Sequence, residues 1–205
     1  MPFFKSSGWM MKNLVGNWLI APIYTYESPE YYTVLSGVNS NLNGDSTAID
    51  RTVYNKSGQK GVGSGVTALY DPSRAGLCTE PATTCSANLV AYQANNPDAM
   101  YITANAGAMP TSQRNTQPIL PIDNLDATAT KRFSFTERYS IQFVAAAFNV
   151  LNHAQYIPGT VDNINSPGYT SQILFQTASN PAFNQPGKFF AANARSMQLA
   201  LKFQF

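Results

Sequence analysis

The last segment of the chain, from Ser196 to Phe205, alternates without a break between polar and apolar side chains. The apolar positions are Met197, Leu199, Leu201, Phe203 and Phe205. A period of two residues is typical of a β-strand whose two faces meet different surroundings. Aromatic residues lie only at the terminal end of the apolar face, as in the interface girdle of a membrane β-barrel. The alternative is a buried edge strand of a secreted β-protein.

Three earlier segments show the same period. Together with the last one, they predict strands over about 14–35, 122–135, 139–151 and 194–205. The second and third are joined by a tight turn at Thr136-Glu137-Arg138, which indicates an antiparallel hairpin. Each strand reaches the roughly 9–11 residues that a membrane-crossing strand needs. Pro22 weakens the first strand because proline has no amide donor. Lys131 interrupts the apolar face of the second near one end, where a long side chain reaches the membrane interface.

Two long stretches, about 36–121 and 152–193, have little periodicity and are predicted to be irregular loops. Within the first of these stretches, the good helix formers from Leu89 to Ala94 predict a short helix. At the start of the chain, Met1 to Lys12 is predicted to be a turn. Outer-membrane barrels combine short periplasmic turns with long extracellular loops. This asymmetry predicts that Thr136-Glu137-Arg138 faces the periplasm and both long loops face outward.

Composition agrees with a barrel and excludes other classes. Charged residues make up 12% of the 205 residues, about half the usual share for a soluble domain. No stretch approaches the roughly 18 consecutive apolar residues of a membrane helix. The net charge of +2 is too small to indicate a nucleic-acid partner. We therefore predict an all-β antiparallel meander of about four or five strands with long irregular extracellular loops, which contacts outer-membrane lipid on one face and water on the other.

Two groups of residues are candidates for a local site. Cys78 and Cys85 lack the second cysteine or histidine pair of a zinc site, so we predict a disulfide in an exposed loop, with two free cysteines as the alternative. The second group resembles a calcium loop only in its spacing, because asparagine replaces most of the aspartates and a plain turn is preferred. Its residues are Asn39, Asn41, Asn43 and Asp45.

Enzymatic motifs are missing from the sequence. His153 is the sole histidine and has no carboxylate close in sequence, so we expect a rim residue at a strand end. Asp123, Asp126 and Glu137 are expected on different faces or ends of their strands. We therefore predict no enzyme, no resident metal and no cofactor. The tyrosines Tyr24, Tyr26, Tyr31 and Tyr32 are interpreted as an interface belt rather than a ligand site such as one for a glycan.

Five motifs occur in an order that resembles the C-terminal end of TonB-dependent outer-membrane receptors, closest to the subgroup with an N-terminal carboxypeptidase-regulatory-like domain. They are S-G-V-N-S-N-L-N-G-D (Ser36 to Asp45), R-N-T (Arg114 to Thr116), I-D-N-L-D (Ile122 to Asp126), T-E-R-Y-S-I-Q-F (Thr136 to Phe143) and A-F-N-V-L-N-H (Ala147 to His153). The terminal strand ending on Phe205 adds to this resemblance.

The resemblance implies a partial barrel over 1–205, without the plug domain, from a receptor of about 22 strands. It implies energy-coupled uptake of a scarce or bulky ligand in the outer membrane of a Gram-negative bacterium. TonB would act only through the plug, and we expect the isolated chain neither to transport nor to fold stably. Leu199, Leu201, Phe203 and Phe205 would form the signal read by the barrel-assembly machinery. The alternative function is adhesion or binding by a secreted or surface-exposed β-sandwich.

Overall fold

The computed structural model describes residues 8–44, 50–77, 81, 85–156, 174–190 and 192–205. These residues divide into two compact units. We call residues 8–29, 120–156 and 192–205 the sheet unit, and residues 30–119 and 174–190 the loop unit. Each unit is described by itself.

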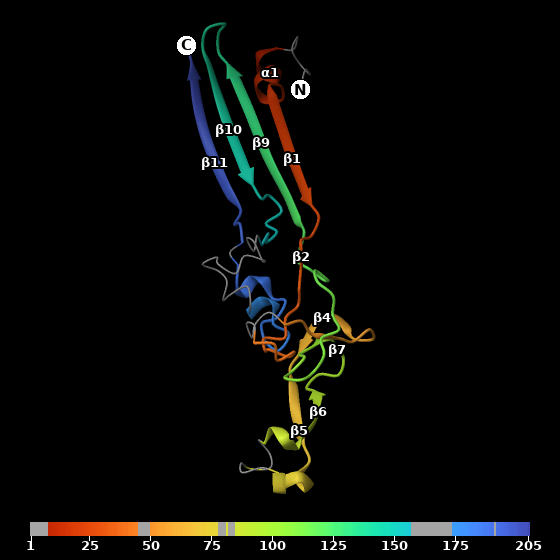
Figure 1. The fold of residues 1–205 in the computed structure, drawn as a ribbon. Helices are drawn as coiled ribbons and strands as arrows, with labels where there is room; N and C mark the ends of the chain where they lie inside the picture. The colour runs from red at the N-terminus through yellow and green to blue at the C-terminus, as the bar shows by residue number, and fades with distance from the viewer. Residues whose placement is uncertain (1–7, 45–49, 78–80, 82–84, 157–173, 191) are drawn as a thin grey trace. The chain divides into compact units, whose positions relative to one another are not determined.

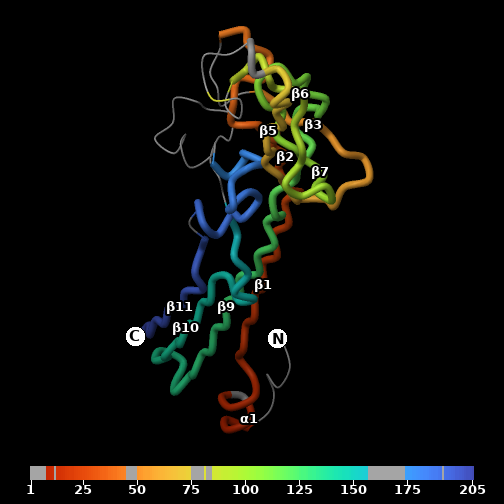
Figure 2. Tube along the Cα trace, turned by 90° about the horizontal axis from the view of Figure 1, so that it is seen from below, coloured from red at the N-terminus to blue at the C-terminus, as the bar shows by residue number. Residues whose placement is uncertain are grey.

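The sheet unit is a four-stranded antiparallel sheet in the order β1-β9-β10-β11 (Figures 1 and 2). Its strands are β1 (Trp18–Glu27), β9 (Ile122–Ser134), β10 (Ser140–Phe148) and β11 (Ser196–Gln204). Neighbouring strands in the sheet follow one another along the chain, apart from the loop-unit strands between β1 and β9. The predicted all-β antiparallel meander is therefore confirmed.

A short helix, α1 (Trp9–Leu14), precedes β1. The prediction of a turn up to Lys12 and a strand from residue 14 is wrong in this region, since β1 begins at Trp18 after Asn17 takes a positive φ of 57°. Both views place α1 at the same end of the sheet as the β9–β10 turn and the C-terminus. Within the described residues, no helix has the length and apolar character needed to span a membrane.

The loop unit contains short strands in three small sheets, pairing as β2-β8, β3-β7-β4 and β5-β6. The strands are β2 (Tyr31–Tyr32), β3 (Val53–Tyr54), β4 (Gln59–Ser64), β5 (Val66–Tyr70), β6 (Leu89–Ala94), β7 (Ala99–Ile102) and β8 (Gln117–Pro118). Three 3-10 helices accompany them, namely η1 (Pro72–Leu77), η2 (Ser86–Asn88) and η3 (Pro186–Lys188). The first long stretch is thus more regular than predicted.

Three predictions for this unit are wrong, each because a partner distant in sequence decides the conformation. Residues Leu89–Ala94 form strand β6 rather than a helix, since they pair with β5. Tyr31 does not prolong the first strand, because β2 pairs with β8 in the loop unit. The glycine-rich residues 58–65, which belong to the stretch predicted to be an irregular loop, contain strand β4. A Cβ added at Gly63 would lie 2.4 Å from the Ala178 carbonyl oxygen. Glycine therefore permits a close backbone approach there.

The core of the loop unit combines side chains from both long loops. Its buried members are Tyr32, Val34, Met100, Tyr101, Ile119, Phe175, Ala178 and Phe183. Phe175 lies at the centre, with its ring centroid 4.8 Å from that of Tyr32 and 5.1 Å from that of Phe190. Burial raises the pKa of Tyr32 well above its usual value, so its hydroxyl stays a neutral donor. It donates to Asn184 Oδ1 over 2.9 Å.

Backbone hydrogen bonds also join the two loops. Leu35 donates its N–H to the Gln176 carbonyl over 3.0 Å, and Ala178 donates to the Leu35 carbonyl over 2.9 Å. Backbone pairing and a shared core therefore both join the two loops. The two segments predicted as separate irregular loops form one folded unit.

We expect Phe175→Ala to destabilise the loop unit by about 3–5 kcal/mol, because it removes a fully buried ring. Leu174→Ala is the matched control, since its side chain is part-exposed and its loss should cost less than about 1 kcal/mol. Hydrogen exchange of loop-unit amides measures both effects, with sheet-unit amides as the internal reference. Equal loss of protection in the two variants would contradict this arrangement of the core.

Candidate membrane-facing surface

The pairing register of the sheet unit brings the apolar sets of all four strands to the same side. Residues opposite each other in an antiparallel pair share a face. Ile141 lies opposite both Phe133 and Phe203, and Trp18 lies opposite Lys131. The apolar face defined in this way comprises Trp18, Ile20, Pro22, Tyr24 and Tyr26 of β1, Leu125, Ala127, Ala129, Lys131 and Phe133 of β9, Ile141, Phe143, Ala145 and Ala147 of β10, and Met197, Leu199, Leu201 and Phe203 of β11.

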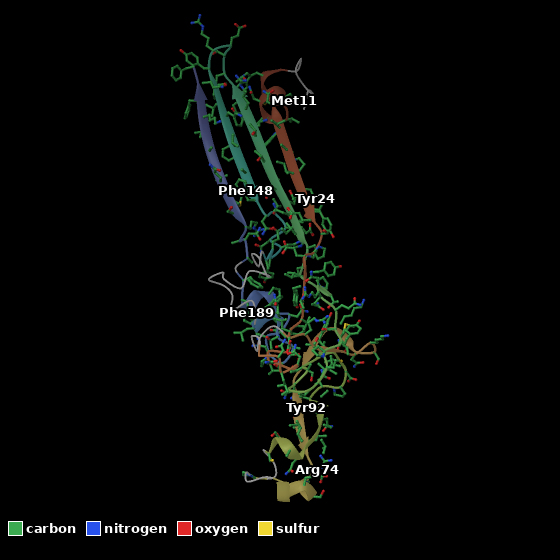
Figure 3. The ribbon with its side chains drawn as sticks, viewed as in Figure 1. Met11, Tyr24, Arg74, Tyr92, Phe148 and Phe189 are labelled. Atoms are coloured by element: carbon green, nitrogen blue, oxygen red, sulfur yellow. The ribbon has the colours of Figure 1, made fainter. Side chains whose placement is uncertain are left out.

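Aromatic side chains gather at the two ends of the apolar face. We call the end with the β9–β10 turn the turn end, and the opposite end the loop end. Trp18, Phe133 and Phe203 lie toward the turn end, and Tyr24 and Tyr26 lie at the loop end. Tyr24 is far along the sheet from Met11 of α1 (Figure 3). A row across the middle of the sheet contains Ile20, Ala129, Ala145 and Leu199. Two aromatic belts around an aliphatic band are typical of a membrane barrel.

Large side chains of the apolar face are not covered by other parts of the described chain. Ile20 is 58% exposed, Leu199 is 64% exposed and Phe203 is 65% exposed. Moving each such side chain into apolar surroundings gains roughly 1.5–3 kcal/mol. An exposed apolar surface of this extent marks contact with a membrane or another protein.

The opposite face is largely polar. Arg132 donates from Nε to Ser140 Oγ over 3.2 Å, and Ser140 in turn donates to Gln204 Oε1 over 3.0 Å. Leu19 and Ile23 of β1 also lie on this face. Asp126 belongs to the polar face and Asp123 to the apolar one, in agreement with the parity of the sequence. The sheet thus has one apolar face and one largely polar face.

The sequence profile of a family described as "Outer membrane beta barrel domain" matches residues 1–198. This chain belongs to that family. It is therefore an outer-membrane barrel protein. No curated protein and no solved structure matches the chain.

Lys131 is the one cation among the described side chains of the apolar face, and it is held in place by backbone carbonyls. Its ammonium group donates to the Leu14 oxygen over 3.1 Å and also to the Gly16 oxygen. It lies 5.0 Å from the centre of the Trp18 ring and 5.4 Å from that of Phe133. The sequence predicted that this side chain reaches the membrane interface. That prediction is wrong, because the Lys131 side chain is only 2% exposed. Carbonyl oxygens and aromatic faces replace water around the charge.

Asn149 organises the loop end of the barrel sheet and explains the A-F-N-V-L-N-H motif. It takes a positive φ of 52° and is buried. Its backbone N–H donates to Asp126 Oδ1 over 2.9 Å, and its side-chain amide donates to the carbonyls of His153 and Asn193, each over 3.0 Å. Asparagine suits this position because it tolerates a positive φ and provides both donors and an acceptor.

His153 has a carboxylate partner that its sequence neighbours did not indicate. Its Nδ1 lies 3.3 Å from Asp123 Oδ2, because the strand end folds back onto β9. The backbone of Asp123 is also bound, since Gln155 donates from Nε2 to its carbonyl over 2.6 Å. Asp123 and His153 are separated by a whole hairpin, so local sequence carries no signal for this contact. The pair lies at the strand end, where we expected a rim residue.

The other candidate residues are only partly described. Asn41 donates from Nδ2 to Asp50 Oδ1 over 3.2 Å, and its own Oδ1 accepts the Asn43 N–H over 3.1 Å, as in an asparagine turn. Asn39 is half-buried, while Asp45 lies outside the described residues, so the calcium candidate stays a prediction. Cys85 is buried and disulfide-bonded. Cys78 lies outside the described residues, and its pairing with Cys85 stays a prediction. The groups of acidic, histidine and cysteine side chains within the described ranges include none suited to a metal ion.

Two of the tyrosines at the predicted belt remain exposed in the barrel sheet, namely Tyr24 and Tyr26. Tyr31 is also exposed but belongs to the loop unit. For Tyr32 the interpretation is wrong, because the side chain is fully buried in the loop-unit core. Packing against Phe175 explains its burial.

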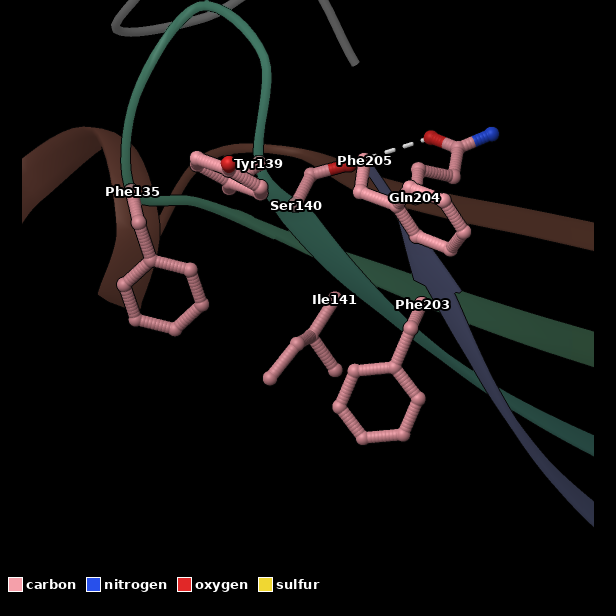
Figure 4. A pocket seen from close by; sticks show the side chains of 7 residues that line it. All are labelled: Phe135, Tyr139, Ser140, Ile141, Phe203, Gln204 and Phe205. Carbon is pink, nitrogen blue, oxygen red and sulfur yellow. Dashed lines mark hydrogen bonds between the residues drawn. The ribbon is translucent and has the colours of Figure 1, made fainter.

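The C-terminal residues line a shallow hollow of about 310 Å³ at the turn end. Its walls are Phe135, Tyr139, Ser140, Ile141, Phe203, Gln204 and Phe205. Figure 4 shows Phe135, Ile141 and Phe203 extending to the same side of the strands. Phe205 lies beyond the last β10–β11 pair and is almost fully exposed. The Phe205 side chain is therefore free to contact another surface.

We expect Lys131→Met to destabilise the membrane-inserted barrel by about 1–3 kcal/mol, because two carbonyls at the turn end lose their charged donor. The matched control is Lys202→Met, which removes an exposed cation from the polar face and should stay within about 0.5 kcal/mol. Urea denaturation of the assembled barrel, reconstituted from outer-membrane fractions into lipid vesicles, measures both changes. A Lys131→Met effect no larger than that of the control would contradict the role of the buried ammonium.

Proposed function

We propose that this outer-membrane barrel protein acts as the C-terminal barrel segment of a TonB-dependent receptor in a Gram-negative bacterium. Its role would be energy-coupled uptake of a scarce or bulky ligand, without enzymatic chemistry. The observation that carries the proposal is the shared register of the four strands, which places every apolar set on one face of a sheet. The five ordered motifs from Ser36 to His153 support the choice of the TonB-dependent receptors among barrel proteins.

The edges of the sheet support incorporation into a larger barrel. Within the described part of the chain, β1 and β11 each pair on one side only. Unpaired N–H and C=O groups at the edges cannot remain in hydrocarbon, where each costs several kcal/mol. A closed barrel satisfies them by adding further strands. We propose that these strands belong to the rest of the receptor barrel and that its plug domain makes the contact with TonB.

The loops support an orientation. The β9–β10 turn is short, whereas the connections after β1 and β10 supply the residues of the loop unit. Barrels of this kind keep short turns in the periplasm and long loops outside. We propose that the turn end faces the periplasm and that the loop unit is extracellular, where it would meet the ligand.

The alternative is a secreted or surface-exposed β-sandwich for adhesion or binding. A sandwich buries the apolar face of one sheet under a second sheet. Here the apolar face of the sheet unit is exposed, and the small sheets of the loop unit have a core of their own. The exposed face favours the barrel.

The central experiment isolates the tagged protein from its host and fractionates the cell envelope. We expect it in the outer membrane, requiring detergent, in a complex with the plug-bearing part of the receptor, and expect TonB to be recovered with that complex after mild cross-linking. A protein found in the outer membrane without TonB would contradict energy-coupled uptake while leaving the barrel intact. A freely soluble protein would instead favour the β-sandwich.

Phe205→Ala should lower the amount of folded protein in the outer membrane several-fold, because the proposed assembly signal ends on this exposed ring. Phe135→Ala is the matched control, since it removes another exposed aromatic from the same hollow but lies outside the terminal strand. The measurement is the heat-modifiable band in outer-membrane fractions. Equal loss in both variants would indicate a general effect of the aromatic belt rather than a terminal signal.

A further inference from the structure

Helix α1 (Trp9–Leu14) presents apolar side chains that no other described residue covers. Five apolar residues in the helix and just after it are exposed, namely Trp9, Met10, Met11, Leu14 and Val15. The lowest exposed fraction is 48%, for Met11. A helix of one or two turns is not stable by itself in water, because the cost of nucleation exceeds the few hydrogen bonds gained. The helix must therefore be held by contacts with the sheet.

Asn13 provides the main attachment of α1. Its side chain donates from Nδ2 to the Ser134 carbonyl over 3.2 Å, and its Oδ1 accepts the Ser134 N–H over 3.0 Å. These two bonds copy the pairing that a strand neighbour would make. They lie beyond Trp18 and Lys131, which form the last pair of β1 with β9. Asn13 is 2% exposed, so the attachment is protected from water.

Trp9 adds a second bond to the same carbonyl. Its indole N–H donates to the Ser134 oxygen over 3.1 Å, while the side chain remains 59% exposed. The polar atom of the indole is satisfied by the sheet and much of the ring is left uncovered. Tryptophan in this state suits the boundary between lipid headgroups and acyl chains.

The buried Lys131 shows on which side of the sheet the helix ends. Lys131 belongs to the apolar face, the side that we propose faces lipid, and its ammonium group binds the carbonyls of Leu14 and Gly16. The residues that follow α1 therefore lie over the lipid side, next to the aromatic rings of Trp18 and Phe133. The apolar side chains of α1 are thus continuous with the aromatic belt at the turn end.

From this continuity we infer that α1 is an interfacial anchor that inserts its exposed apolar side chains into the lipid leaflet at the turn end. The occupant of this surface is the lipid itself, at the depth of the headgroup–acyl boundary. Amphipathic helices bind there through buried apolar area. The inference rests on the membrane placement of the sheet and does not depend on TonB or on uptake.

The two tryptophans of the chain allow a direct test. Trp18→Phe leaves Trp9 as the reporter in α1, and Trp9→Phe leaves Trp18 as the reporter on the lipid-facing sheet. The assembled barrel that contains each variant is reconstituted from outer-membrane fractions into phosphatidylcholine vesicles that carry bromine on the acyl chains, either near the headgroup or near the bilayer centre, and a Trp9→Phe/Trp18→Phe chain in the same barrel gives the background to subtract. We expect Trp9 fluorescence to be quenched at least twofold more by the shallow bromines than by the deep ones.

Trp18 reports insertion of the sheet in the same preparation. Quenching of Trp18 without quenching of Trp9 would overturn the anchor and leave the barrel in the membrane. Emission from Trp9 that is shifted to short wavelength yet insensitive to bromine would also overturn it, because a protein segment would then cover the helix. If neither tryptophan is quenched, the membrane placement of the sheet fails as well.

Asn13→Ala, added to the Trp18→Phe chain, tests the attachment. It keeps every apolar side chain of α1 but removes both bonds to the Ser134 backbone. We expect shallow quenching of Trp9 to fall by about half, while Trp18 quenching in the corresponding Trp9→Phe chain stays unchanged. Unchanged Trp9 quenching would overturn the claim that Asn13 positions the anchor.

Discussion

The sheet unit depends on one constraint, the register of backbone hydrogen bonds between its four strands. Side chains along a strand alternate with a period of two, so a slip of one residue would send a strand's apolar set to the opposite face. In the observed register Ile141 lies between Phe133 and Phe203, and the remaining apolar positions follow at every second residue. A continuous apolar face exists only because all three pairings agree.

The two ends of the sheet handle polar groups in different ways. At the turn end, the Asn13 side chain binds the N–H and the carbonyl of Ser134, the last residue of β9. The Lys131 ammonium group binds the carbonyls of Leu14, at the end of α1, and of Gly16. At the loop end, Asn149 joins the end of β10 to the carbonyls of His153 and Asn193. Both devices place side-chain amides or an ammonium group where strand pairing ends. Unsatisfied backbone groups there would be costly beside a membrane.

The loop unit shows how long connections gain structure without long strands. Residues from the two loops meet around Phe175 and Tyr32, and backbone bonds between Leu35 and the segment near Gln176 join them. A shared core offsets the entropy lost by ordering so many loop residues. Such a unit can present a defined surface, which a pair of independent flexible loops could not.

The sequence by itself determined the period of each barrel strand, the apolar parity of β9, β10 and β11, and the all-β class, because local alternation records the two environments of a strand. It also placed Asp123 and Asp126 on opposite faces. Only the tertiary structure decided that β6 is a strand rather than a helix, that Tyr32 is buried and that His153 meets Asp123. In each case a partner distant in sequence determines the outcome, and propensity or local pattern contains no information about that partner. The contacts of Lys131 with backbone carbonyls were likewise decided only by the tertiary structure. These carbonyls come from residues before β1 that reach β9 only in the folded sheet.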